Sequence, residues 1–77
     1  MKKLIAYLVK SHRIRKNMTQ QALADRMEIE RQYVWKIEHE KVNISLDYLD
    51  NIIRGLGCSP SEFFGGLTDD FSQQSEA

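Results

Sequence analysis

Two short amphipathic segments joined by only three residues constrain this chain more than any other feature of its sequence. The first segment follows a threonine that can cap a helix, and it keeps its apolar residues one turn apart. The connection is Glu28 to Glu30, and the second segment is Arg31 to His39. In this second segment Val34 and Ile37 define one apolar stripe, and the residues opposite are polar. The sequence therefore predicts two short helices joined by a tight turn, over residues 20–38.

The other predicted elements are also helices. Residues 2–16 repeat apolar positions at helical spacing and end at Asn17, a residue that tolerates the left-handed conformation. Ser45 can cap a further helix that is closed by Gly55 or Gly57. The residues expected to face inward on this helix are Leu46, Leu49, Ile52, Ile53 and Leu56.

The last predicted helix follows a proline-containing capping box, Ser59 to Glu62. It carries Phe63 and Phe64 and is stopped by the glycine pair that follows. The prediction is an all-α domain of five helices over residues 1–66. The polar and acidic residues 67–77 are expected to form a disordered tail.

The net charge of zero conceals an uneven distribution of charges along the chain. Residues 1–18 contain six basic residues and no acidic residue, whereas residues 67–77 contain three acidic residues and no basic one. Without that tail the chain has 11 basic and 8 acidic residues, a net charge of +3. Such a charge suits a nucleic-acid partner and fits a solvated helix face equally well.

The residues that usually carry catalysis or metal binding are sparse. A single cysteine, Cys58, excludes an internal disulfide, and with His12 and His39 it forms no recognised zinc spacing. His12 and Cys58 are expected to be core or half-buried residues. We therefore expect no enzyme, no metal, no cofactor and no small-molecule ligand. The sequence contains no apolar stretch of membrane-spanning length, and we expect a cytoplasmic protein.

The outer face of the segment Arg31 to His39 has the chemistry of a major-groove reader. Arg31 and Lys36 can donate to guanine O6 and N7, and Gln32 can pair with adenine. Trp35 shares this face, and an exposed tryptophan among cations is costly without a partner. Gln20, at the start of the preceding helix, is placed to bind a phosphate. Together the two segments predict a DNA-binding helix-turn-helix. Its base-reading residues are Arg31, Gln32, Trp35 and Lys36.

The sequence Arg-Ile-Arg-Lys-Asn-Met-Thr-Gln-Gln-Ala-Leu-Ala, from Arg13 to Ala24, and the pair Ile37-Glu38 resemble the Cro/CI (XRE) family of helix-turn-helix regulators. The resemblance covers about residues 5 to 64 and implies a five-helix fold like that of lambda repressor. Within the family, Arg31 to Val34, Asn43 to Leu46 and the Ser-Glu-Phe-Phe ending are similar to the controller proteins of restriction–modification systems.

The resemblance also implies roles for individual residues. Arg13 and Glu38 would form an internal ion pair that orients the reading helix. The residues expected to contact the DNA backbone are Gln20, Tyr33, His39, Lys41 and Asn43.

Four residues depart from the family pattern. Glu28 and Glu40 stand where the family commonly has glycine, and a left-handed glutamate costs roughly 1 kcal/mol or more. Glu30 replaces the usual small capping residue, and Trp35 replaces a small polar one. The target sequence of this protein is therefore expected to be its own.

The adjacent phenylalanines near the C-terminus predict a dimer. On a helix Phe63 and Phe64 point about 100° apart, so that one ring joins the core and the other requires a second surface. Tyr48 and Leu67 could enlarge this dimer interface. We expect a homodimeric transcriptional regulator that binds a pseudo-palindromic double-stranded DNA operator, with its two reading helices about 34 Å apart. The alternative is an antitoxin-type protein-interaction module that binds a toxin protein and regulates its own operon.

Overall fold

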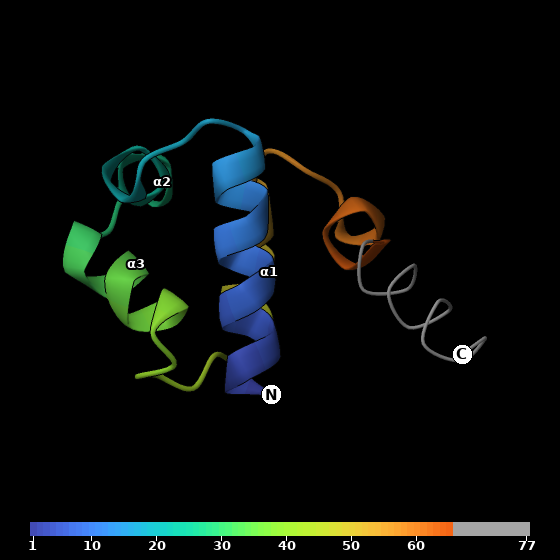
Figure 1. Ribbon diagram of the computed structural model, residues 1–77, viewed down its shortest axis with the longest axis horizontal. Helices are drawn as coiled ribbons and strands as arrows, with labels where there is room; N and C mark the ends of the chain where they lie inside the picture. The colour runs from blue at the N-terminus through green and yellow to red at the C-terminus, as the bar shows by residue number, and fades with distance from the viewer. Residues whose placement is uncertain (66–77) are drawn as a thin grey trace.

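The computed structural model describes residues 1–65, and it is helical throughout this range apart from the connections. Its helices are α1 (Lys2–Arg15), α2 (Gln20–Met27), α3 (Arg31–Glu38), α4 (Leu46–Leu56) and a further helix over residues 60–65. Figure 1 shows α1 standing between the α2–α3 pair and the helix of residues 60–65. The all-helical prediction is confirmed, while the expected tail and Leu67 lie outside the described residues.

The ends of α2 and α4 form where the sequence places capping residues. The Thr19 hydroxyl accepts a hydrogen bond from the backbone N–H of Ala22 at 3.0 Å. The Ser45 hydroxyl accepts from the N–H of Tyr48 at 3.1 Å. Each bond satisfies a backbone donor that the first turn of a helix otherwise leaves without an intrahelical partner.

The predicted capping box opens the helix of residues 60–65. The Ser59 N–H donates to Glu62 Oε1 at 3.1 Å, and the Glu62 N–H donates to Ser59 Oγ at 3.1 Å. The hydrogen bond from the Ser59 backbone lowers the pKa of the Glu62 carboxyl, and the hydrogen bond with the Ser59 side chain lowers it by a smaller amount. The stabilisation is therefore present above the ordinary pKa of a glutamate and is lost as the pH falls through the lowered pKa.

A left-handed residue lies at or just after the C-terminal end of each of the four helices α1 to α4. Asn17 and Glu28 both have φ of 57°, and Glu40 has φ of 60°. Gly57, with φ of 74°, closes α4, and Gly55 remains inside the helix. A Cβ atom at Gly55 would lie 2.7 Å from Met27 Cγ, so a larger residue here would force the Met27 side chain of α2 to shift.

The core is formed by the inward faces of all the helices. Its buried members are Ile5, Leu8, Val9, Leu23, Ala24, Val34, Ile37, Leu49, Ile52, Ile53, Leu56 and Phe63. Phe63 is fully buried, and its ring stacks on the His12 ring with centroids 5.2 Å apart. His12 Nε2 lies 3.0 Å from the Phe63 carbonyl oxygen and donates to it, which fixes the last helix on α1. His12 is thus a buried histidine, as the sequence predicts.

Leu46 was predicted to face inward, and this prediction is wrong. Its side chain is 85% exposed, and burial on α4 begins only at Leu49. Leu46 is the first residue of the helix, and this first turn projects beyond the core that the later turns share. Helical spacing gives the direction of a side chain but not the point along the helix at which neighbouring helices begin to cover it.

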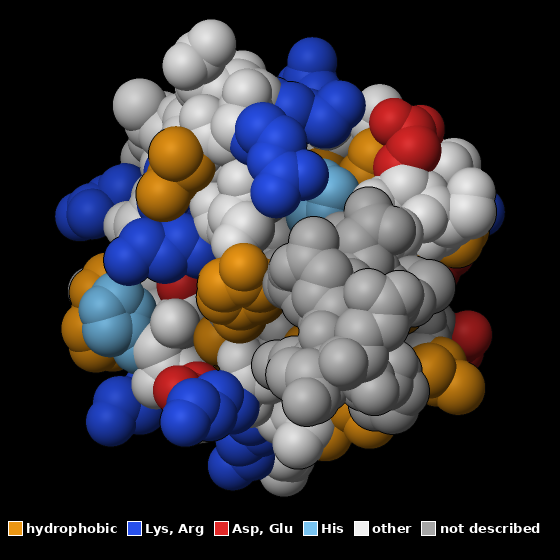
Figure 2. Space-filling view, turned by 45° about the vertical axis from the view of Figure 1, so that its right-hand side comes forward, with side chains coloured by type: hydrophobic (Ala, Val, Ile, Leu, Met, Phe, Trp, Pro, Cys, Tyr) orange, Lys and Arg blue, Asp and Glu red, His pale blue; other side chains and the backbone are white. Residues whose placement is uncertain are grey.

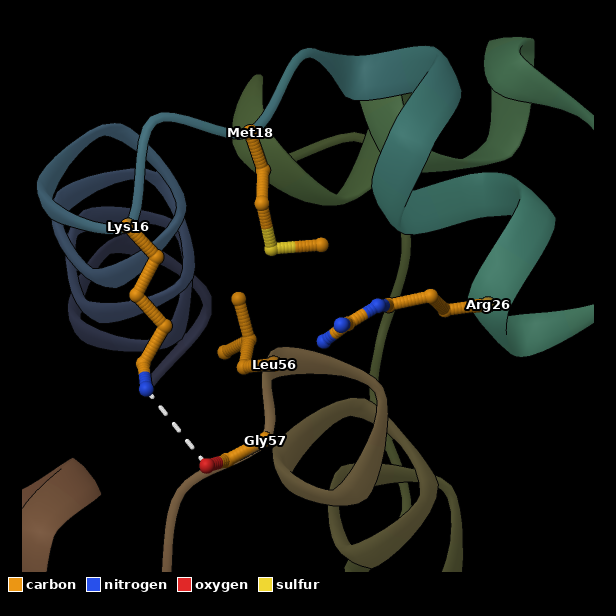
Figure 3. Close-up of a pocket in the computed structure, with 5 residues that line it drawn as sticks. All are labelled: Lys16, Met18, Arg26, Leu56 and Gly57. Atoms are coloured by element: carbon orange, nitrogen blue, oxygen red, sulfur yellow. Dashed lines mark hydrogen bonds between the residues drawn. The ribbon is translucent and has the colours of Figure 1, made fainter.

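Two basic side chains, one at the end of α1 and one on α2, donate hydrogen bonds to the C-terminal end of α4. Lys16 donates to the Gly57 carbonyl oxygen at 3.4 Å, and Arg26 donates to that of Gly55 at 3.2 Å. Figure 3 shows both side chains directed toward this end, around a hollow of about 430 Å³ with Met18 and Leu56 between them. Carbonyl groups at a helix C-terminus carry partial negative charge, so each cation satisfies an acceptor and complements the helix dipole.

We predict that Phe63→Ala lowers the free energy of unfolding by about 3–5 kcal/mol, because it empties a fully buried aromatic site. The matched control is Leu46→Ala, which removes an exposed side chain and should change stability by no more than about 0.5 kcal/mol. Urea denaturation followed by circular dichroism measures both. Equal losses for the two variants would contradict the burial described here.

Candidate nucleic-acid interface

The outer face of α3 brings the four predicted base-reading residues together. Arg31, Gln32, Trp35 and Lys36 are exposed and line a single hollow of about 460 Å³. The opposite face is buried in the core through Val34 and Ile37. The predicted rotation of α3 about its axis is therefore confirmed. The contacts of these side chains with bases stay a prediction.

Trp35 and His39 form an exposed aromatic stack along α3. Their ring centroids are 3.9 Å apart and their planes differ by 15°. His39 Nδ1 lies 2.8 Å from the Trp35 carbonyl oxygen and donates to it, which holds the imidazole over the indole. Trp35 is 41% exposed. This stack was not predicted from the sequence, although residues four positions apart on one helix are neighbours on its surface.

A largely buried ion pair connects α1 to the end of α3. Arg13 Nε donates to Glu38 Oε2 at 2.7 Å, and Arg13 Nη2 donates to Glu38 Oε1 at 3.1 Å. The side chains are 11% and 1% exposed, respectively. Arg13 Nη1 also donates to the carbonyl oxygen of Met18, at 2.7 Å, in the connection before α2. One guanidinium thus fixes α1, the connection before α2 and the end of α3 relative to one another.

Gln20 belongs to the same network. Its Nε2 donates to Glu38 Oε1 at 3.3 Å, and its side chain is half-buried. Gln20 is predicted from the sequence to bind a phosphate, and that contact stays a prediction. One amide hydrogen is engaged by Glu38, and the second can still donate to an outside acceptor. The network orients this donor at the start of α2.

The other residues expected at the DNA backbone lie on α3 and in the connection that follows it. Lys41 and Asn43 are exposed, and the Lys41 N–H donates to the Lys36 carbonyl oxygen at 2.9 Å, which ties the connection to α3. Tyr33 is half-buried, and its ring meets the Tyr48 ring edge-on with centroids 5.5 Å apart. Burial, and to a smaller degree Tyr33, raises the pKa of Tyr48, which therefore stays a neutral phenol.

The expected dimer residues occupy different environments. Phe63 is fully buried within the protomer, so its inclusion among surface contacts of the dimer is corrected: its side chain belongs to the core. Phe64 is half-buried and meets Phe63 edge-on with centroids 5.0 Å apart. Tyr48 is also half-buried, and Leu67 lies outside the described residues.

The rest of the described chain offers little chemistry of other kinds. Burial raises the pKa of the Cys58 thiol, which keeps the thiol protonated and unreactive. Among residues 1–65, no three histidine, cysteine, aspartate or glutamate side chains are grouped as a metal site would require. None of the helices in this part of the chain is both long and apolar enough to cross a membrane.

Basic side chains gather on one part of the surface. Figure 2 shows Lys and Arg side chains over the left half and the top of the face in view, with hydrophobic side chains between them. A surface of this kind attracts a polyanion and still provides apolar contacts.

Comparison with known proteins identifies the fold and its family. A family model described as helix-turn-helix matches residues 9–63, which include α2, α3 and the whole network around Glu38. The chain belongs to this helix-turn-helix family. The family resemblance predicted from Arg13 to Ala24 is thereby confirmed. Among curated proteins, no sequence matches the chain.

This helix-turn-helix protein is also similar to solved structures of a restriction–modification controller protein, C.Esp1396I. The wild-type controller has 30% sequence identity and a TM-score of 0.83, over 91% of this chain and 92% of that one. Its tetramer in complex with a natural 35 base-pair operator has 31% identity and a TM-score of 0.82, over 88% and 90%. The controller bound to a 25 base-pair operator site has 30% identity and a TM-score of 0.82, over 91% and 92%.

We predict that Arg13→Met lowers the free energy of unfolding by about 3–5 kcal/mol, because it leaves the Glu38 carboxylate buried without its cation. The double variant Arg13→Met/Glu38→Leu should recover most of this loss, since neither charge is then buried. Urea denaturation measures both. A double variant as unstable as the single one would show that the ion pair is not the source of the effect.

Proposed function

We propose that this protein is a transcriptional regulator of the restriction–modification controller type, which binds a two-fold-symmetric operator as a homodimer and inserts α3 into the major groove. The observation that carries the proposal is the grouping of Arg31, Gln32, Trp35 and Lys36 around one hollow on the outer face of α3. Solved controllers with the same fold and about a third identical residues are bound to operator DNA. Such a regulator works in the cytoplasm, where its DNA lies.

The exposed donors of α3 provide sequence discrimination. Arg31 and Lys36 donate to guanine O6 and N7, and Gln32 forms a bidentate pair with adenine N6 and N7. These three side chains are free to reach bases because the inward residues, Val34 and Ile37, provide the attachment to the core. Sequence reading and folding stability are therefore assigned to opposite faces of one helix.

The surrounding residues bind the DNA backbone and fix the register of α3 in the groove. Gln20 presents its amide from the start of α2, where it is oriented by Glu38. Lys41 presents its ammonium group and Asn43 its side-chain amide from the connection after α3. His39 lies at the C-terminal end of that helix. Tyr33 completes the set from the edge of the core. Contacts of this kind supply affinity without sequence information.

The dimer is formed through the C-terminal part of the chain. The half-buried Phe64 and Tyr48 provide the apolar contact, with Leu67 beyond the described residues. Phe63 supports Phe64 from within the core through their edge-on contact. A two-fold axis here repeats α3 at the spacing of one DNA turn, about 34 Å.

The first test is selection of bound sequences from random double-stranded DNA, followed by footprinting. We expect a pseudo-palindromic site. Alanine substitution of Arg31, Gln32 or Lys36 should cost about 1–3 kcal/mol on that site and relax preference at particular base pairs. If the folded protein enriches no sequence, DNA regulation is rejected in favour of the protein-binding alternative. If the three variants lose affinity equally on selected and random DNA, the base-reading roles are wrong.

A second test concerns Lys41. The logarithm of the binding constant should fall linearly with the logarithm of salt concentration, and Lys41→Ala should reduce the slope by about one per subunit. Arg54→Ala is the matched control, because Arg54 is an exposed cation on α4 that pairs with Asp50 and has no assigned DNA contact. An unchanged slope for Lys41→Ala removes this residue from the interface.

A third test separates the two phenylalanines. Phe64→Ala should remain folded yet sediment as a monomer and lose cooperative operator binding, because the apolar contact between subunits is removed. Tyr7→Ala, which alters an aromatic side chain that is 57% exposed on α1, should remain dimeric. A wild-type protein that sediments as a monomer well above the concentration that fills its operator would contradict the dimer.

A further inference from the structure

We propose that Trp35, held in place by His39, reads the C5-methyl groups of pyrimidines in the major groove, so that the protein distinguishes thymine from uracil and 5-methylcytosine from cytosine. The inference rests on the proposed function, because it requires α3 to lie in the groove. It assigns a chemical target to the large apolar side chain on a face that is otherwise polar.

The first observation is the geometry of the indole. The stack on His39, with centroids 3.9 Å apart and planes within 15°, supports one face of the indole ring. The hydrogen bond of 2.8 Å from His39 Nδ1 to the Trp35 carbonyl oxygen ties the supporting ring to the turn that carries the tryptophan. The indole is therefore restrained before any DNA is present, which reduces the conformational entropy lost on binding.

The second observation is the position of the indole among hydrogen-bonding side chains. Arg31 and His39 lie one turn before and one turn after Trp35, and Gln32 and Lys36 form the neighbouring row. Except for His39, these side chains line the same hollow as the indole. The indole ring lies beside side chains that donate hydrogen bonds to base edges. It therefore faces the same part of the major groove as those side chains.

The third step is the chemistry of the groove. The C5-methyl group of thymine is the apolar group that an unmodified base pair presents in the major groove, and 5-methylcytosine presents the same group at the equivalent position. Uracil and cytosine lack it. Covering this methyl group with the restrained indole buries apolar surface and so contributes favourable binding free energy. Contact of the indole with the polar edges of the bases contributes little.

The size of the effect follows from the burial of one methyl group. Removal of one methyl contact is expected to weaken binding about fourfold, and removal at both half-sites of a symmetric operator about sixteenfold. These values are large enough to measure and small enough to leave a stable complex. If the indole instead contacted the sugar–phosphate backbone, the binding affinity would not depend on the methyl group at any position.

The experiment uses the full chain and the operator duplex obtained by selection, with thymines replaced one position at a time by uracil. We expect one position in each half-site where the wild-type protein loses affinity about fourfold. At the same position Trp35→Ala should bind the thymine and uracil duplexes equally, while Trp35→Phe, which keeps a flat ring, should retain part of the preference. A cytosine placed there should be bound more tightly once it carries a 5-methyl group.

Two further variants isolate the role of His39 and provide a control. His39→Ala should reduce the preference for methylated bases, because the indole loses its support, and the loss of the proposed backbone contact of His39 should weaken binding to methylated and unmethylated duplexes by the same factor. Tyr7→Ala, on α1, should retain the full preference. Trp35 is substantially exposed, so its variants should fold, and circular dichroism checks this.

Several results would overturn the inference. Uracil substitution that changes affinity nowhere in the operator would contradict it while leaving the proposed function intact. A Trp35→Ala variant that keeps the wild-type preference, or that weakens all sequences equally, would place the indole elsewhere on the DNA. Failure of selection to yield any operator would reject the proposed function and this inference together.

Discussion

The buried ion pair between Arg13 and Glu38 is the interaction on which the placement of the exposed face of α3 depends. A carboxylate whose side chain is 1% exposed is tolerated only where a cation and hydrogen-bond donors reach it. Glu38 ends α3, Arg13 comes from α1, and Gln20 opens α2. Because all three must converge, α3 can occupy only one orientation relative to the rest of the domain, and its outer face is presented to solvent as a fixed surface.

The helices and their ends could be predicted because they depend on short-range chemistry. Thr19 and Ser45 cap through the N–H of a residue three positions ahead in the chain, and the information is therefore local. The sequence left open whether Gly55 or Gly57 ends α4, because either glycine can adopt the left-handed conformation, and the structure places that conformation at Gly57. The exposure of Leu46 could not be predicted, because it depends on how far neighbouring helices extend.

The outer face of α3 shows the same division between local and tertiary information. The rotation of α3 was predictable, since Val34 and Ile37 define an inward stripe whatever lies beneath it. The hydrogen bond between Gln20 and Glu38 was not, because it joins side chains from two helices whose approach only the fold determines. Phe63 and Phe64 were predicted to divide between core and surface, and the packing of His12 decided which ring is inside.

Three exposed carboxylates lie next to the ends of α3, and two of them belong to left-handed residues. Glu28 in the turn before α3 and Glu40 just after it are exposed, and Glu30 adds a third carboxylate beside the helix. These negative charges precede and follow α3 in a chain whose formal net charge is zero. General electrostatic attraction supplies most of the affinity of a regulator for unrelated DNA. Carboxylates at these three positions offset part of that attraction, so contacts that depend on the base sequence must supply a larger share of the binding free energy.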